Sequence, residues 1–236
     1  MKNSLDIKNF YHNGFVIRKI ENLNYLKKIE KETITTVMKF LNIKKQPDLF
    51  LENLHQYIDY EQINPLRIEV YKTLNKKKWF REFYYNLAKK TIQEIVGDEL
   101  AMQTNINFSF QLPKDSTSQL SIHADTLSGE SKFQVVLWVP LMNVSKTSSM
   151  YILNKKESIK NINNLKKFQF DGMEKIYYNN KKKIKFLNIK KNYFLLFSPN
   201  LLHGNVINEE KMTRVSMNCR FKNLLSPYNN KKIHFG

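Results

Sequence analysis

The sequence predicts an α+β fold in which helices come first and antiparallel strands follow. Apolar residues recur at helical spacing through the first hundred residues, whereas polar and apolar residues alternate in several segments after residue 100. Helices followed by a run of strands are typical of this class. With only 6 Gly and 6 Pro in 236 residues, no stretch resembles a linker. We therefore expect one domain, residues 1–236, with mainly helical support in 1–100 and a strand-rich core in 101–236.

Three segments make up the predicted helical half. Residues 10–20 indicate the end of a short helix, an Asn-Gly turn and a small strand. Apolar residues at approximately helical spacing predict a helix over 22–42 and a second helical region over 66–97. Gly97 is placed to end the second region.

Four strands are predicted in the second half. Residues 105–112 alternate strictly between polar and apolar, which is the period of an extended chain. Residues 133–139 and 193–197 are almost continuously apolar, and a Ser-Pro-Asn turn closes the second of these. Residues 213–221 alternate again. Trp138 is expected in the core.

The lysine-rich segment 154–191 is polar and lies between two predicted strands. We expect a hairpin around residues 177–180 within it. Together with residues 126–132, this segment is also expected to supply lid elements around a substrate.

The alternating strands have one polar and one apolar face. In an ordinary sandwich the polar face would meet solvent, whereas in a barrel-like fold it can point inward and line a wet pocket. In 213–221 the apolar face is Val215, Met217, Cys219 and Phe221, and the polar face is Arg214, Ser216, Asn218 and Arg220.

Two histidines and a carboxylate are spaced as metal ligands. His123 and Asp125 are two residues apart, so on an extended chain both side chains project from the same face. His203 follows an apolar strand 80 residues later and can complete a facial triad. Such a triad leaves positions open on non-haem Fe(II) for a cosubstrate and oxygen. The alternative is a hydrogen-bonded surface pair, because His-x-Asp is a short motif that also arises by chance.

A candidate anion-binding pair follows the second histidine. Arg214 lies eleven residues after His203, and Ser216 shares its strand face. A guanidinium fork and a hydroxyl are what the distal end of a buried dicarboxylate requires. Arg214 could instead be a surface arginine, but a polar interior would also explain Asn218 and Arg220.

Several motifs together resemble the phytanoyl-CoA dioxygenase-like family of Fe(II)/2-oxoglutarate oxygenases, and the similarity covers most of the chain. It is strongest to small bacterial members found in antibiotic-sugar and surface-carbohydrate gene clusters. The motifs that carry the resemblance are Phe10 to Val16, His123-Ala124-Asp125-Thr126, Trp138-Val139-Pro140-Leu141, Ser148 to Leu153, His203-Gly204-Asn205 and Arg214.

The resemblance implies a double-stranded β-helix (jelly-roll, cupin-like) core with the N-terminal helices packed outside. It implies Fe(II) held by His123, Asp125 and His203, with 2-oxoglutarate and molecular oxygen as cosubstrates. Arg214, assisted by Ser216, would bind the distal carboxylate of 2-oxoglutarate. The implied activity is that of a 2-oxoglutarate-dependent dioxygenase.

The resemblance further implies that Asn107 and Gln111 help to hold the 2-oxoglutarate carboxylate near iron. The chain departs from the family in two places: Asn205 stands where many members have Ser or Thr, and Ser149 where a turn Gly is usual. Halogenating members replace the metal carboxylate with a small residue. Because Asp125 is present, hydroxylation or a related oxidation is expected.

Three functions remain compatible with the sequence, whose net charge is +18. The expected one is oxidation of a small polar molecule: a sugar, aminocyclitol or nucleotide-linked sugar of carbohydrate or natural-product biosynthesis, to which a phosphorylated substrate would suit the charge. The second is the same chemistry on a nucleic acid or other polyanion. It is disfavoured because the lysines are dispersed rather than gathered in a patch. The third is a non-catalytic jelly-roll binding protein.

The cysteine count and the N-terminal sequence bear on compartment. Cys219 is the only cysteine, which excludes a disulfide framework and a multi-thiolate metal site within the monomer. The first residues have no signal-peptide core, and no window has the roughly 20 apolar residues of a membrane span. We therefore expect a cytoplasmic protein without a membrane partner. The sequence carries no signal for oligomeric state.

Overall fold

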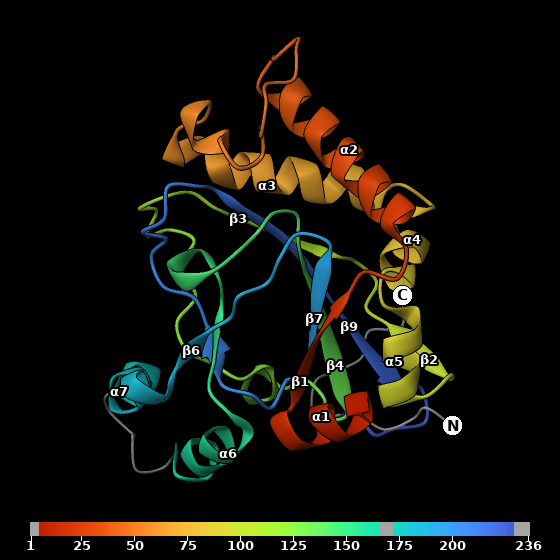
Figure 1. Ribbon diagram of the computed structural model, residues 1–236, viewed down its shortest axis with the longest axis vertical. Coiled ribbons are helices and arrows are strands. Elements are labelled where there is room, and N and C mark those ends of the chain that lie inside the picture. The colour runs from red at the N-terminus through yellow and green to blue at the C-terminus, as the bar shows by residue number, and fades with distance from the viewer. Residues whose placement is uncertain (1–4, 166–171, 229–236) are drawn as a thin grey trace.

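The computed structural model describes residues 5–165 and 172–228, and its central feature is a pair of antiparallel sheets (Figure 1). The larger sheet has six strands in the order β1-β7-β4-β9-β2, with β3 also paired to β9, and the smaller has the order β6-β5-β8. The strands are β1 (Phe15–Lys19), β2 (Leu100–Met102), β3 (Asn107–Gln111), β4 (Gln134–Pro140), β5 (Tyr151–Ile152), β6 (Lys185–Phe186), β7 (Tyr193–Phe197), β8 (His203–Gly204) and β9 (Arg214–Asn223).

Helices lie outside the sheets, with α2, α3 and α4 together along one side of the larger sheet (Figure 1). The α-helices are α1 (Leu5–Asn13), α2 (Leu23–Phe40), α3 (Tyr60–Asn75), α4 (Phe80–Asn86), α5 (Lys89–Val96), α6 (Lys155–Asn163) and α7 (Gly172–Asn180). Short 3₁₀ turns are η1 (Leu54–Gln56), η2 (Asp125–Ser128), η3 (Lys146–Ser148) and η5 (Lys181–Lys183). Among the described residues, none of these helices combines the length and apolar character needed to cross a bilayer.

Local sequence explains where the N-terminal helices start and stop. The Asn22 side chain accepts a hydrogen bond from the Tyr25 amide and caps α2, which occupies the predicted range 22–42. The predicted region 66–97 contains three helices instead of one, and the first begins earlier, at a capping box formed by Asp59 and Gln62. Gly97 ends the last of them at φ 88°, a conformation that favours glycine.

The hairpin predicted around residues 177–180 is wrong, because α7 occupies this stretch. Met173, Ile176, Tyr177 and Asn180 are the less exposed positions of α7, and their spacing is that of one helix face. The Asn180 side chain donates to Asn161 Oδ1 of α6 at 3.1 Å, which joins the two helices. The many polar residues between these positions concealed the helical period.

Two apolar clusters support the region of the site. The larger fills the space between the main sheet and its helices and includes Val215, Met217, Cys219 and Phe221 of β9. The smaller links α7, β5 and the segment before η2, and consists of Ile122, Ala124, Tyr151, Leu153, Ile176 and Leu202. Ala124 of this cluster stands between His123 and Asp125, so the segment that carries both side chains is anchored from behind.

Candidate metal centre

His123 and His203 are cross-strand neighbours although they are far apart in sequence. Each backbone amide donates to the other residue's carbonyl, at 2.9 Å from His123 and 2.8 Å from His203. Because residues directly opposite each other in an antiparallel pair project to the same side, the two imidazole rings lie together, with centroids 4.3 Å apart.

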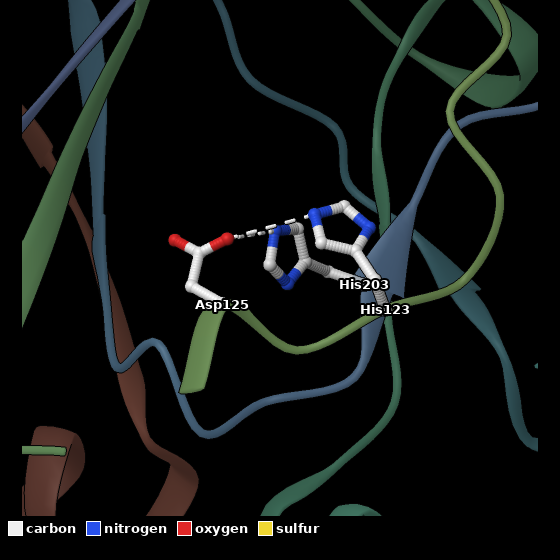
Figure 2. A group of neighbouring side chains, drawn as sticks. All are labelled: His123, Asp125 and His203. Carbon is white, nitrogen blue, oxygen red and sulfur yellow. Dashed lines mark ion pairs between the residues drawn. The ribbon is translucent and has the colours of Figure 1, made fainter. Parts of the chain in front are cut away.

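Asp125 points at both imidazoles from the start of η2 (Figure 2). Its Oδ1 lies 3.6 Å from His123 Nε2 and 3.9 Å from His203 Nε2. The ligand atoms of the three residues all lie within 4.8 Å of one another, so one ion could bind all three. Two imidazoles and one carboxylate are the donor set of a facial triad for non-haem Fe(II).

Backbone carbonyls fix which nitrogen of each imidazole ring faces the place where the three ligand atoms meet. His123 Nδ1 lies 2.9 Å from the Ser121 carbonyl, and His203 Nδ1 lies 2.8 Å from the Leu201 carbonyl. A carbonyl only accepts hydrogen bonds, so each Nδ1 carries the proton and donates. In the neutral form of each ring, Nε2 then has a free lone pair on the side of Asp125, the arrangement that orients metal-binding histidines.

The protonation tendencies of the three groups differ. Burial lowers the pKa of His203 to about 4, so this ring is neutral and ready to ligate at neutral pH. Burial also opposes the charged form of His123, but the nearby Asp125 carboxylate and the hydrogen bond to the Ser121 carbonyl outweigh it and raise its pKa. Burial opposes ionisation of Asp125 too, yet His123, His203 and Arg220 together hold its pKa well below the usual range.

Arg220 binds the carboxylate oxygen that faces away from the histidines. Its Nη2 and Nε donate to Asp125 Oδ2 at 2.9 and 3.2 Å, while its Nη1 donates to Gln103 Oε1 at 3.3 Å. Oδ1 is therefore the oxygen left for a metal ion. Sequence reasoning placed Arg220 in a polar lining but missed this contact with Asp125.

A cavity of about 280 Å³ opens beside the three residues. One wall is polar and comes from strands β3 and β9, through Ser109, Arg214, Asn218 and Arg220. An adjoining part of the lining is apolar and consists of Val136, Trp138, Met150 and Phe197. Trp138 was expected only in the core; it is buried, but it also forms part of this wall because it lies opposite Asn218 in the β4–β9 pair.

Arg214 is a buried cation that the described chain satisfies only in part. Its side chain lines the cavity and its Nη2 donates to Ser109 Oγ at 3.1 Å. Neither Arg214 Nε nor the Oγ of buried Ser216 has a hydrogen-bond partner among the described residues. Burial lowers the pKa of Arg214 to about 10, which keeps it charged at neutral pH. Buried polar atoms are rarely left unpaired, so Arg214 at the cavity fits an anionic ligand such as a carboxylate, whereas Ser216 lies on the same strand face but is not among the residues that line the cavity.

The structure does not bring Asn107 and Gln111 to the cavity wall. Asn107 donates to Asn218 Oδ1 at 3.2 Å, and Gln111 Nε2 donates to the Val206 carbonyl at 2.6 Å. Ser109, between them on the same face of β3, does line the cavity. Sequence reasoning missed Ser109, although the same alternation that marks its neighbours also places it there.

The unusual Asn205 fastens a loop at the cavity. Its Oδ1 accepts from the Leu120 amide and its Nδ2 donates to the Ser118 carbonyl, so it holds the segment before His123 in place. The neighbouring Gly204 is needed for close packing, since a Cβ there would lie 2.6 Å from the Tyr151 hydroxyl and 2.7 Å from the Leu120 carbonyl. Ser149, the other departure, is buried beside Met150 of the cavity wall.

Comparison with solved structures identifies the architecture. The non-heme monooxygenase ThoJ, solved as a nickel complex, superposes with a TM-score of 0.59 at 10% identity, over 92% of this chain and 77% of ThoJ. HygX from Streptomyces hygroscopicus, with nickel and 2-oxoglutarate bound, gives 0.57 at 11% identity over 93% and 87%. EctD from S. alaskensis, with 2-oxoglutarate and 5-hydroxyectoine, gives 0.61 at 12% identity over 94% and 77%.

The likeness shows the fold. The predicted α+β class, with a cupin-like double-stranded β-helix core and helices outside, is confirmed by these structures and by the two antiparallel sheets. No family model and no curated sequence matches the chain. The chemistry of this chain therefore has to be argued from its own side chains.

Proposed function

We propose that this protein is an Fe(II)/2-oxoglutarate-dependent oxygenase that hydroxylates or otherwise oxidises a small polar molecule. The observation that carries the proposal is the convergence of His123, Asp125 and His203 beside a buried, partly unpaired Arg214 in one cavity. A metal triad alone fits many metals. A triad together with a buried guanidinium suits a metal that shares its site with a dicarboxylate.

Different side chains of this site would bind the metal, bind the cosubstrate and exclude water. His123, Asp125 and His203 would hold Fe(II), with Arg220 fixing the orientation of the Asp125 carboxylate. Arg214 and Ser216 would bind the distal carboxylate of 2-oxoglutarate. When bound, iron and 2-oxoglutarate supply the oxidising chemistry, in which oxygen-dependent decarboxylation to succinate is coupled to oxidation of a substrate C–H bond. Trp138 and Phe197 would keep water from the reacting centre.

The substrate class follows from analogy and from cavity chemistry. EctD and HygX have structures with small molecules bound, 5-hydroxyectoine in one and hygromycin B in the other. By the family resemblance, a sugar, aminocyclitol or nucleotide-linked sugar of carbohydrate or natural-product biosynthesis is proposed here. The half-polar, half-apolar wall suits a ring with hydroxyl groups. A cytoplasmic enzyme is also proposed, since a single cysteine suits a reducing compartment.

The test is spectroscopic and needs no substrate. Anaerobic protein with Fe(II) and 2-oxoglutarate should develop the weak visible charge-transfer band of the metal chelate. His123→Ala should abolish the band, whereas His12→Ala, which removes an exposed histidine of α1, should retain it. Admission of oxygen to the wild-type complex should then yield succinate. If the wild-type protein shows no band and makes no succinate, the proposal is wrong.

A further inference from the structure

Three arginines line the cavity, and only one of them has no partner in the proposed chemistry. Arg220 is bound to Asp125, and Arg214 is assigned to the cosubstrate carboxylate. The third, Arg67 of α3, is half-buried, and its Nη2 donates to Asn64 Oδ1 at 2.5 Å. A guanidinium has five N–H donors, so most of those on Arg67 remain available to a ligand.

The position of Arg67 is fixed by the way α3 is attached to the sheet. Near one end of the helix, Asn75 bonds both the amide and the carbonyl of Ile106 at 2.9 Å, just before β3. At the other end, the Tyr60 hydroxyl donates to the Pro113 carbonyl at 3.0 Å, just after β3. Arg67 lies in the middle of α3 and Ser109 in the middle of β3, and both line the cavity. Arg67 is thus held at the cavity by a doubly anchored helix.

The charges around the cavity do not balance without an anionic substrate. Asp125 is the only acidic side chain among the described lining residues. It offsets Arg220, and a ferrous ion would offset the two charges of 2-oxoglutarate. Arg214 and Arg67 then leave the loaded site positive, even when the buried carboxylate of Asp115 is counted, which accepts hydrogen bonds from the lining residues Thr117 and Ser118. A site with this balance attracts anions and repels cations.

We propose that Arg67 binds a phosphate group of the substrate, so that the enzyme acts on a phosphorylated or nucleotide-linked sugar. Gln119, which is exposed and lines the same cavity, adds a polar group for the phosphate or its neighbouring hydroxyls. The planar fork of arginine matches the geometry of a phosphate better than that of a neutral sugar. A cationic aminocyclitol is disfavoured by the same charges. This inference rests on the proposed oxygenase function and narrows its substrate.

The experiment measures binding to a site that cannot turn over. The protein is loaded with Ni(II) and 2-oxoglutarate and titrated by calorimetry with glucose 1-phosphate, UDP-glucose, glucose and glucosamine. We expect the two phosphorylated probes to bind at least about tenfold more tightly than glucose, with glucosamine weakest. Added salt should weaken the phosphorylated probes alone.

Substitutions in α3 test whether Arg67 is the residue that binds the phosphate group. Arg67→Ala should lower affinity for the phosphorylated probes by roughly tenfold, and Arg67→Lys should lose less because it keeps the charge. Lys72→Ala removes an exposed positive charge from the same helix but not from the cavity, and should change nothing. Equal, absent or Arg67-independent binding of the phosphorylated probes overturns the inference. A normal Fe(II)/2-oxoglutarate band in wild type and in Arg67→Ala shows that such a result leaves the oxygenase function intact.

Discussion

Strand β9 has one apolar and one polar face, and both carry buried residues. The two faces differ in whether the protein itself supplies all the contacts that those residues need. On one face, Val215, Met217 and Cys219 are fully buried in the main core. On the other, Arg214 and Ser216 are also buried, yet each has a polar atom without a partner among the described residues. Burial alone therefore does not distinguish core from site. The difference is that apolar side chains are satisfied by their neighbours, whereas the polar face needs a ligand to complete it.

Even the one reactive side chain on the apolar face belongs to the core. Cys219 is fully enclosed, and burial raises the pKa of its thiol to about 12. A thiol that stays protonated is neither a nucleophile nor a metal ligand. Chemistry on β9 is thus confined to the face that lines the cavity.

Substitution of Arg214 gives the largest effect expected on the polar face. Arg214→Met should weaken 2-oxoglutarate binding by about 3–5 kcal/mol, because the distal carboxylate loses its buried counter-charge. The unfolding free energy of the unliganded protein should stay equal or rise, since an incompletely bonded cation is replaced by an apolar side chain of similar length. Titration of the anaerobic chelate band and urea unfolding measure the two quantities. Lower stability with unchanged 2-oxoglutarate affinity would assign Arg214 a structural role and remove the contrast between the faces.

Substitution on the opposite face should show the reverse pattern. Met217→Ala leaves a cavity in the main core and should lower the unfolding free energy by about 2–5 kcal/mol. The 2-oxoglutarate affinity of the folded fraction should remain within about twofold, because Met217 points away from the cavity. Urea unfolding followed by titration at a temperature where the variant is folded separates the two effects. A large loss of cosubstrate affinity in the folded variant would mean that the faces are coupled.

Alternation made the two faces of β9 predictable from sequence, whereas long-range contacts did not become visible until the chain was folded. The period of two in residues 213–221 separated Arg214 from Val215 correctly. It could not show that Arg220 bonds Asp125, because that contact depends on where η2 meets the sheet. Asn107 and Gln111 were singled out on the same face as Ser109, but of the three only Ser109 lines the cavity, and the period of two could not show this.

The helices also show which features the sequence alone predicts well and which it does not. The strong amphipathic pattern of α2 predicted it well, but α7 carries so many polar residues that its helical period was hidden. Arg67 could not have been singled out from sequence at all. It is one of many basic residues, and only the attachment of α3 to both ends of β3 brings it to the cavity.

Substitution of Ser216 is expected to change stability and cosubstrate affinity least. It tests most directly whether the polar face of β9 needs a ligand while the apolar face does not. Its Oγ has no hydrogen-bond partner among the described residues, so Ser216→Ala removes no bond from the unliganded protein, and its unfolding free energy should change by less than about 0.5 kcal/mol or increase. With 2-oxoglutarate bound, the same hydroxyl can donate to a carboxylate, and its loss should weaken binding by about 1 kcal/mol, roughly fivefold. Ser158→Ala is the control, because that buried hydroxyl donates to the Leu153 carbonyl and accepts from the Leu202 amide, so its loss should lower stability. If Ser216→Ala instead destabilised the unliganded protein as Ser158→Ala does, the Ser216 hydroxyl would be serving the fold, and the polar face would be as complete by itself as the apolar one.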